Sequence, residues 1–122
     1  MIHTRAYIIN LALCLGVLFV ASCGKQHTAE QTVKNFVAEN MKEGVETKRL
    51  DFGDLGTTKH IKESLIAKMR KNGAELFKND IVYGKVPTGE VYYLRMKYLH
   101  EGDTLQNTFY LDSELKEVIA FK

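Results

Sequence analysis

The chain has 122 residues, of which 17 are lysine or arginine and 15 are aspartate or glutamate. This near balance of charge argues against a nucleic-acid-binding protein, which would normally carry a marked excess of basic residues. The length supports one domain with one modest hydrophobic core.

Residues 1–22 have the pattern of a secretory leader. Arg5 supplies one fixed positive charge, and the stretch from Ala6 to Ala21 is apolar, with Asn10 as its only amide. This stretch is shorter than the ~20 residues that a membrane-spanning helix needs. We therefore predict that residues 1–22 are a signal peptide rather than a transmembrane anchor.

The leader ends in Val20-Ala21-Ser22-Cys23. This segment resembles the lipobox of bacterial lipoproteins, in which an aliphatic residue and two small residues precede the modified cysteine. The resemblance implies that the Cys23 thiol carries diacylglycerol, that the chain is cut before Cys23, and that the new amino terminus is acylated, with palmitate as a typical chain. Cys23 is thus the predicted lipid attachment site. At ~0.8 kcal/mol for each buried CH₂, two or three acyl chains would hold the protein stably in a lipid bilayer.

The residues after the cysteine predict where the protein is held. In the enterobacterial sorting scheme an aspartate after the cysteine favours the inner membrane, and this chain has Gly24 there. We therefore expect a cell-envelope protein at the outer membrane. Residues 23–27 form the lipidated cysteine and a short tether that reaches at most ~14 Å. The other cysteine, Cys14, leaves with the leader, so the single domain of residues 28–122 should fold without a disulfide.

Two helices are predicted in the first half of this domain. Thr28 and Gln31 match a capping box that starts the first helix, and Gly44 suits the left-handed position after its end. Its apolar face contains Val33, Phe36, Val37 and Met41. The periodicity then lapses over residues 45–57, which predicts an ordered loop.

The second helix is predicted to start at Thr57 or Thr58 and to stop at Asn72-Gly73. Its apolar stripe consists of Ile61, Leu65, Ile66 and Met69, and its other side carries Lys59, Lys62, Lys68, Arg70 and Lys71. We interpret this basic side as a solvated surface; contact with anionic headgroups is the alternative.

After Asp80 the apolar period changes to two. The pattern predicts a short strand over residues 81–83 and three longer strands over 90–99, 105–111 and 117–121. The turn at residues 100–103, with Gly102 in the left-handed position, fixes the hairpin register. Expected pairs are Tyr92–Leu111, Tyr93–Tyr110, Leu94–Phe109, Arg95–Thr108, Met96–Asn107, Lys97–Gln106 and Tyr98–Leu105. Ile119 and Phe121 are expected to join the buried face of this sheet.

Helices followed by an antiparallel meander with one apolar face predict an α+β domain, with the N-terminal helices packed on one face of the sheet. This order resembles the two-layer cystatin-like and nuclear-transport-factor-like folds, an arrangement also found in small lipoproteins of Gram-negative bacteria. The resemblance rests on architecture and implies no functional residue beyond Cys23.

Asn107 is the one amide on the predicted apolar face. A buried amide must be hydrogen-bonded. Asn107 therefore either satisfies a buried backbone group, which we favour, or serves as a ligand handle in a pocket with Tyr92 and Tyr98.

No catalytic residue, metal site or cofactor is predicted. Ser64 and Ser113 lie outside any nucleophile elbow, and the histidines His27, His60 and His100 lack a metal-binding spacing. Two function classes stay open. The first, which we favour, is a monomeric, non-catalytic module that binds an envelope protein or a small ligand. The second is a small enzyme of the cystatin-like superfold with a pocket between helix and sheet.

Overall fold

The computed structural model describes residues 24–122. The predicted signal peptide and the lipidation of Cys23 lie outside the described residues and stay predictions. Within the part of the chain that is described, no helix has the length and apolar character to cross a membrane.

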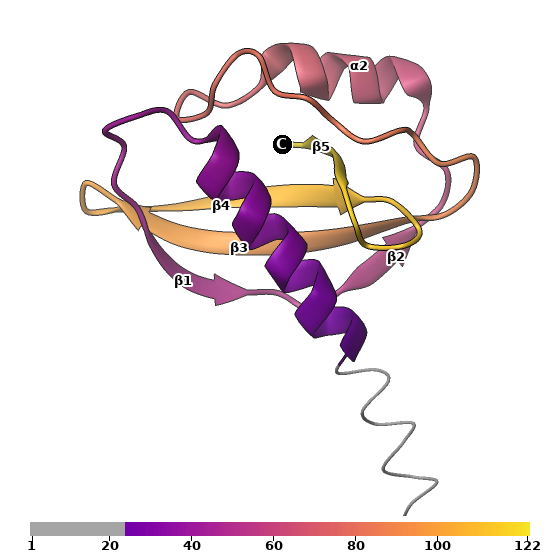
Figure 1. The fold of residues 1–122 in the computed structure, drawn as a ribbon, viewed down its shortest axis with the longest axis horizontal. Coiled ribbons are helices and arrows are strands. Elements are labelled where there is room, and N and C mark those ends of the chain that lie inside the picture. Colours follow the sequence, from indigo (N-terminus) through magenta and orange to yellow (C-terminus); the bar gives the residue numbers. More distant parts are fainter. Residues whose placement is uncertain (1–23) are drawn as a thin grey trace, which may run out of the picture.

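The N-terminal helix covers residues 24–40 and crosses the sheet diagonally (Figure 1). The predicted capping box is wrong, because the Thr28 hydroxyl donates to the carbonyl of Gly24 at 2.8 Å from inside the helix. Gln26, in the first turn that the structure describes, joins the helix to the segment between Phe52 and Gly56. Its side-chain amide donates to the Gly53 carbonyl at 3.0 Å and accepts from the Leu55 amide at 2.7 Å.

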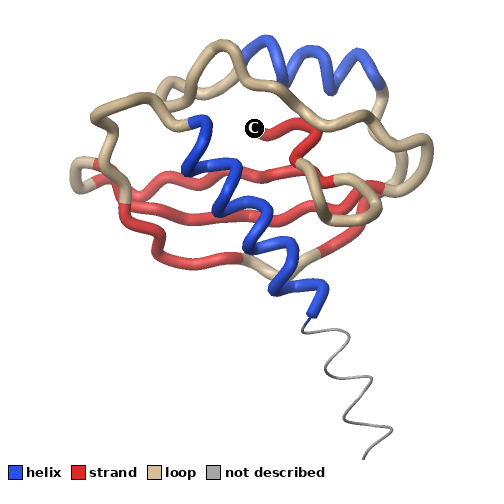
Figure 2. The backbone as a smooth tube through the Cα atoms, viewed as in Figure 1, coloured by secondary structure: helices blue, strands red, loops and turns tan. Residues whose placement is uncertain are grey.

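The sheet has five antiparallel strands in the order β1-β3-β4-β5, with β2 also paired to β3. The strands are β1 (Lys48–Phe52), β2 (Gly56–Thr58), β3 (Val91–His100), β4 (Asp103–Leu111) and β5 (Val118–Phe121). Two helices packed against this open sheet confirm the predicted α+β class (Figures 1 and 2).

The predicted loop over residues 45–57 is wrong, because β1 and β2 occupy most of it. Both strands pair with β3 and form one edge of the sheet. The side chains of β1 are largely solvent-exposed, with Leu50 at 48%, and β2 is too short and too little buried to show a pattern. An edge strand without a buried face shows no apolar alternation, so the period-2 signal was absent.

The strand predicted over residues 81–83 is also wrong. Val82 is 90% exposed, and this segment belongs to the long connection that returns below α2 to the start of β3 (Figure 2). It is joined to β5 by the Gly84 amide, which donates to the Val118 carbonyl at 3.0 Å, and by the packing of Tyr83 on Phe121.

The β3–β4 hairpin has the predicted register, with all seven expected pairs confirmed. The turn residues Glu101 and Gly102 have φ angles of 49° and 84°. Two left-handed residues in a two-residue loop form a type I′ turn, whose twist matches that of the strands. Leu94 and Phe109 are consequently fully buried beneath the N-terminal helix, whereas Arg95 is exposed.

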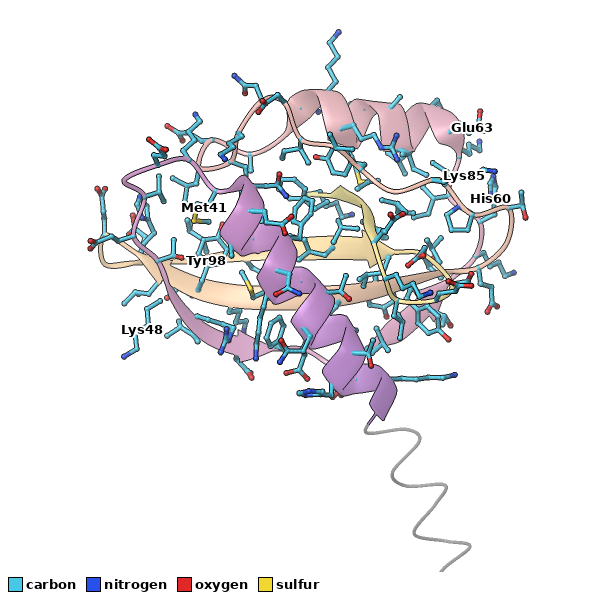
Figure 3. The ribbon with its side chains drawn as sticks, in the orientation of Figure 1. Met41, Lys48, His60, Glu63, Lys85 and Tyr98 are labelled. Carbon is cyan, nitrogen blue, oxygen red and sulfur yellow. The ribbon has the colours of Figure 1, made fainter. Side chains whose placement is uncertain are left out.

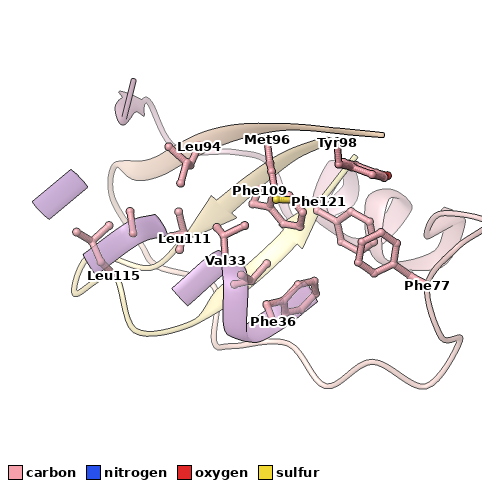
Figure 4. Close-up of a cluster of buried hydrophobic side chains, with 12 residues drawn as sticks. Val33, Phe36, Phe77, Leu94, Met96, Tyr98, Phe109, Leu111, Leu115 and Phe121 are labelled. Carbon is pink, nitrogen blue, oxygen red and sulfur yellow. The ribbon is translucent and has the colours of Figure 1, made fainter. Parts of the chain in front are cut away.

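The main core fills the space between the N-terminal helix and the sheet with aromatic rings (Figure 4). The ring centroid of Phe36 lies 5.9 Å from that of Phe109 and 5.7 Å from that of Phe121. Phe109 and Phe121 stack on each other at 5.5 Å, and Phe77 approaches Phe121 to 4.6 Å.

A second, smaller cluster lies under α2 (Glu63–Asn72). This helix starts after Lys62, later than predicted, and ends at Gly73 as predicted. Its buried residues Ile66 and Met69 pack with Val91, Ile119 and Ala120. Leu65, expected in the buried stripe, is 50% exposed.

The two helices do not share one face, because β5 is buried on both sides. A register shift between Tyr110 and Leu111 turns Ile119 toward α2, while Phe121 faces the main core. The prediction for Phe121 is confirmed, and the prediction that Ile119 joins the same face is wrong.

We expect Phe36→Ala to lower the free energy of unfolding by ~3–5 kcal/mol, because it removes a ring that three core phenylalanines contact. Denaturant unfolding of residues 26–122, which retain Gln26, measures this change. Gln31→Ala on the exposed side of the same helix is the control and should stay within ~0.5 kcal/mol. A loss below ~1 kcal/mol for Phe36→Ala would contradict this description of the core.

The hairpin register predicts opposite results at neighbouring residues. Leu94→Asp should prevent folding, because an unpaired carboxylate would enter the main core. Arg95→Asp should change stability by no more than ~0.5 kcal/mol, because its side chain is exposed. Circular dichroism with thermal unfolding distinguishes the two variants, and the reverse ranking would refute the register.

Candidate functional site

The structure brings together two of the three residues of the predicted pocket. Asn107 is 8% exposed and Tyr98 is 3% exposed. The Tyr98 hydroxyl donates to the Asn107 side-chain oxygen, and the Asn107 amide donates to the Lys122 carbonyl at 3.3 Å. Tyr92 pairs with Leu111, four residues along β4 from Asn107, which is ~13 Å in an extended strand.

This bonding corresponds to the structural role that we favoured for Asn107. Both of its polar groups have a partner within the fold. Burial raises the pKa of Tyr98 above its usual value, so its hydroxyl is a protonated donor at neutral pH. The stability that the protonated Tyr98 hydroxyl contributes is fully present at pH values below the ordinary pKa of tyrosine. It is lost as the pH rises through the higher pKa of Tyr98 in the folded protein.

Among the hollows on the described surface, three are lined by other residues. One of about 340 Å³ lies between the N-terminal helix and residues 82–84 and 116–118. It has mixed charge, with Glu39, Lys116 and Glu117 in its lining. Another of about 260 Å³ lies on the outer face of the sheet beside Leu65.

The third hollow, of about 420 Å³, lies at the carboxyl end of α2. We call it the basic hollow, because three of its lining residues are cations and none is acidic. Its lining is Arg70, Lys71, Asn72, Gly73, Ala74, Lys78, Asn79, Ile81 and Tyr83.

Arg70 connects the elements around this hollow. Its Nε donates to the Ile119 carbonyl in β5 and its Nη2 donates to the Gly84 carbonyl, both at 2.8 Å. The bond to Ile119 satisfies a carbonyl of β5 that the β4 ladder does not use, and the bond to Gly84 joins the loop to the same guanidinium. The guanidinium also lies over the ring of Tyr83, at 5.0 Å from its centroid.

The hydroxyl of Tyr83 is buried and has no hydrogen-bond partner among residues 24–122. Burial raises the pKa of Tyr83, and the positive charge of Arg70 partly opposes this. The hydroxyl is therefore a protonated donor at neutral pH. Tyr83 lines both the basic hollow and the hollow beside the N-terminal helix.

Sequence reasoning missed Arg70 and Tyr83 as site residues. Arg70 was assigned to the solvated side of its helix, yet its partners lie 49 and 14 residues away in the chain. Tyr83 was assigned to a strand. No local pattern signals either contact, because both depend on how α2 meets β5.

In the described part of the chain, no three residues of the types His, Cys, Asp and Glu come together as a possible metal site. Comparison of the chain with family models, curated proteins and solved structures gives no match.

Replacing Asn107 tests its role. Asn107→Leu leaves the buried Tyr98 hydroxyl without its acceptor, which should cost ~1–3 kcal/mol of stability, whereas the Lys122 carbonyl keeps its bond from the Thr108 amide. The double variant Tyr98→Phe/Asn107→Leu should recover part of this loss, because both members of the buried pair become apolar. Denaturant unfolding of the four chains measures the coupling. Unchanged or higher stability for Asn107→Leu alone would favour the ligand-handle interpretation.

Proposed function

We propose that the chain is a lipid-anchored binding module of the bacterial cell envelope, attached to the outer membrane through Cys23. The observation that carries this proposal is the lipobox-like segment Val20-Ala21-Ser22-Cys23, and the described chain is already helical at residue 24. A helix that follows the acylated cysteine at once would keep the domain close to its membrane.

The filled core supports a binding module over the alternative of a small cystatin-like enzyme. Such an enzyme needs a pocket between helix and sheet with an inward-facing acid or base. In this domain the rings of Phe36, Phe109 and Phe121 occupy that space. The polar side chain closest to a pocket role, Asn107, is engaged by Tyr98 and Lys122.

The position of α2 bears on which partner the module meets. The N-terminal helix starts at the lower right of the molecule in Figure 1, whereas α2 lies along its top. With Cys23 held in a bilayer, the basic side of α2 would face away from that bilayer. This arrangement favours a soluble ligand or an envelope protein over the headgroups of the anchoring membrane.

Changing Cys23 to Ala tests the anchor. The variant should stay in the precursor form and incorporate no radiolabelled palmitate, because the thiol that accepts diacylglycerol is missing. Wild-type chain should be labelled and should fractionate with outer-membrane markers in a sucrose gradient. Equal labelling of the two chains would contradict lipidation at Cys23, and wild-type chain among inner-membrane markers would contradict the location.

A further inference from the structure

Positive charge is concentrated in the part of the domain that forms the basic hollow. Residues 59–85 contain seven lysine or arginine residues against three acidic ones, a net charge of +4. The other described residues contain nine against twelve, a net charge of −3. Charge is therefore unevenly distributed over the domain, although the whole chain is nearly balanced. The positive part consists of α2 and the loop that follows it.

The positively charged residues that line the hollow come from two segments of the chain. Arg70 and Lys71 lie in the last turn of α2, where they also offset the negative end of the helix dipole. That role does not explain Lys78, which lies in the loop after the helix and lines the same hollow. Cations from two separate segments therefore meet around one space that no acidic side chain lines.

The wall of the hollow is rigid at Arg70. A guanidinium has five N–H donors, and the two bonds to Ile119 and Gly84 fix it while leaving donors free. Asn72 and Asn79 also line the hollow.

Tyr83 supplies the second, independent observation. Its buried hydroxyl has no acceptor among the described residues, and an unsatisfied buried donor lowers stability. An acceptor oxygen bound in the hollow would satisfy it after a small shift of the side chains that cover the hydroxyl. The oxygen would approach beside the Arg70 guanidinium, which lies over the same ring.

We propose that the basic hollow binds the phosphate group of a small phosphorylated ligand, such as a sugar phosphate. A phosphate ester carries up to two negative charges and three strong acceptor oxygens, which match donors from a fixed guanidinium, two lysines and a tyrosine hydroxyl. The volume of about 420 Å³ exceeds that of a lone ion and lies within the range of small-ligand pockets. The inference rests on the proposed function in that it names the ligand class of that binding module.

Isothermal titration calorimetry on the full-length chain in a non-ionic detergent tests the ligand class. Glucose 6-phosphate should bind and glucose should not, with inorganic phosphate weaker than the sugar ester. Affinity for glucose 6-phosphate should fall as salt is raised, because exposed lysines contribute. Absence of binding by both phosphate compounds, or equal binding of glucose, would overturn the proposal.

Variants locate the site within the chain. Tyr83→Phe should weaken glucose 6-phosphate binding ~10-fold or more, as expected for a lost hydrogen bond to a charged group. Its stability should not fall, because the removed hydroxyl has no partner in the fold. Lys78→Gln should weaken binding and reduce its salt dependence. Unchanged affinity in both variants would show that phosphate binds elsewhere and would refute the assignment.

Two matched controls accompany these variants. Lys85→Gln removes a positive charge from the same segment, but Lys85 does not line the hollow, and in the view of Figure 3 it appears at the Glu63 end of α2. Tyr110→Phe removes a tyrosine hydroxyl on the outer face of the sheet. Both should leave affinity unchanged, and a loss in Lys85→Gln equal to that in Lys78→Gln would point to diffuse charge attraction instead of a site.

The phosphate group could come from a soluble molecule or from a lipid headgroup. A soluble short-chain phosphatidylglycerol, titrated below its micelle concentration, distinguishes them. Tighter binding of glucose 6-phosphate supports the soluble source, and tighter binding of the lipid supports the same site with a headgroup as ligand. Full-length Cys23→Ala should bind as wild type, so a failed binding test and a failed lipidation test remain distinguishable.

Discussion

The double-sided burial of β5 is the constraint on which the rest of the domain depends. Val118 and Phe121 face the main core, and Ile119 and Ala120 face α2. Phe121 is fully buried and contacts the rings of four aromatic residues. One four-residue strand thereby holds the N-terminal helix, the sheet, the loop after α2 and α2 itself in one body, without a disulfide.

The same strand connects the fold to the candidate site. Arg70 bonds to the backbone of β5 at Ile119 and to the loop at Gly84, so it both closes the sheet edge and fixes the wall of the basic hollow. Gly84 is itself constrained, because a Cβ there would lie 2.5 Å from a Glu117 oxygen. The geometry around Tyr83 is therefore set by the contacts that complete the sheet.

The aromatic core and the hollows divide the structure between folding and binding. Rings fill the space between helix and sheet, and a hydrogen-bonded amide closes one end of the apolar face. The candidate binding site, the basic hollow, therefore lies at the surface, where the loop after α2 meets the carboxyl end of α2. Phe77 anchors that loop in the main core, whereas Lys78 and Asn79 beside it are exposed, so changes of these two polar residues should disturb the core little.

The sequence by itself determined the features that follow from local pattern. Alternation over β3 and β4, with Gly102 in the turn, set every pair of the hairpin, and Gly73 set the end of α2. It also carries the lipobox-like segment at Cys23. Only the tertiary structure decided the features that lack such a pattern. The edge strands β1 and β2 bury too little to alternate, and the register shift beside Leu111 redirected Ile119. Arg70 and Tyr83 form a site because packing of α2 on β5 brings together residues that are distant in the chain.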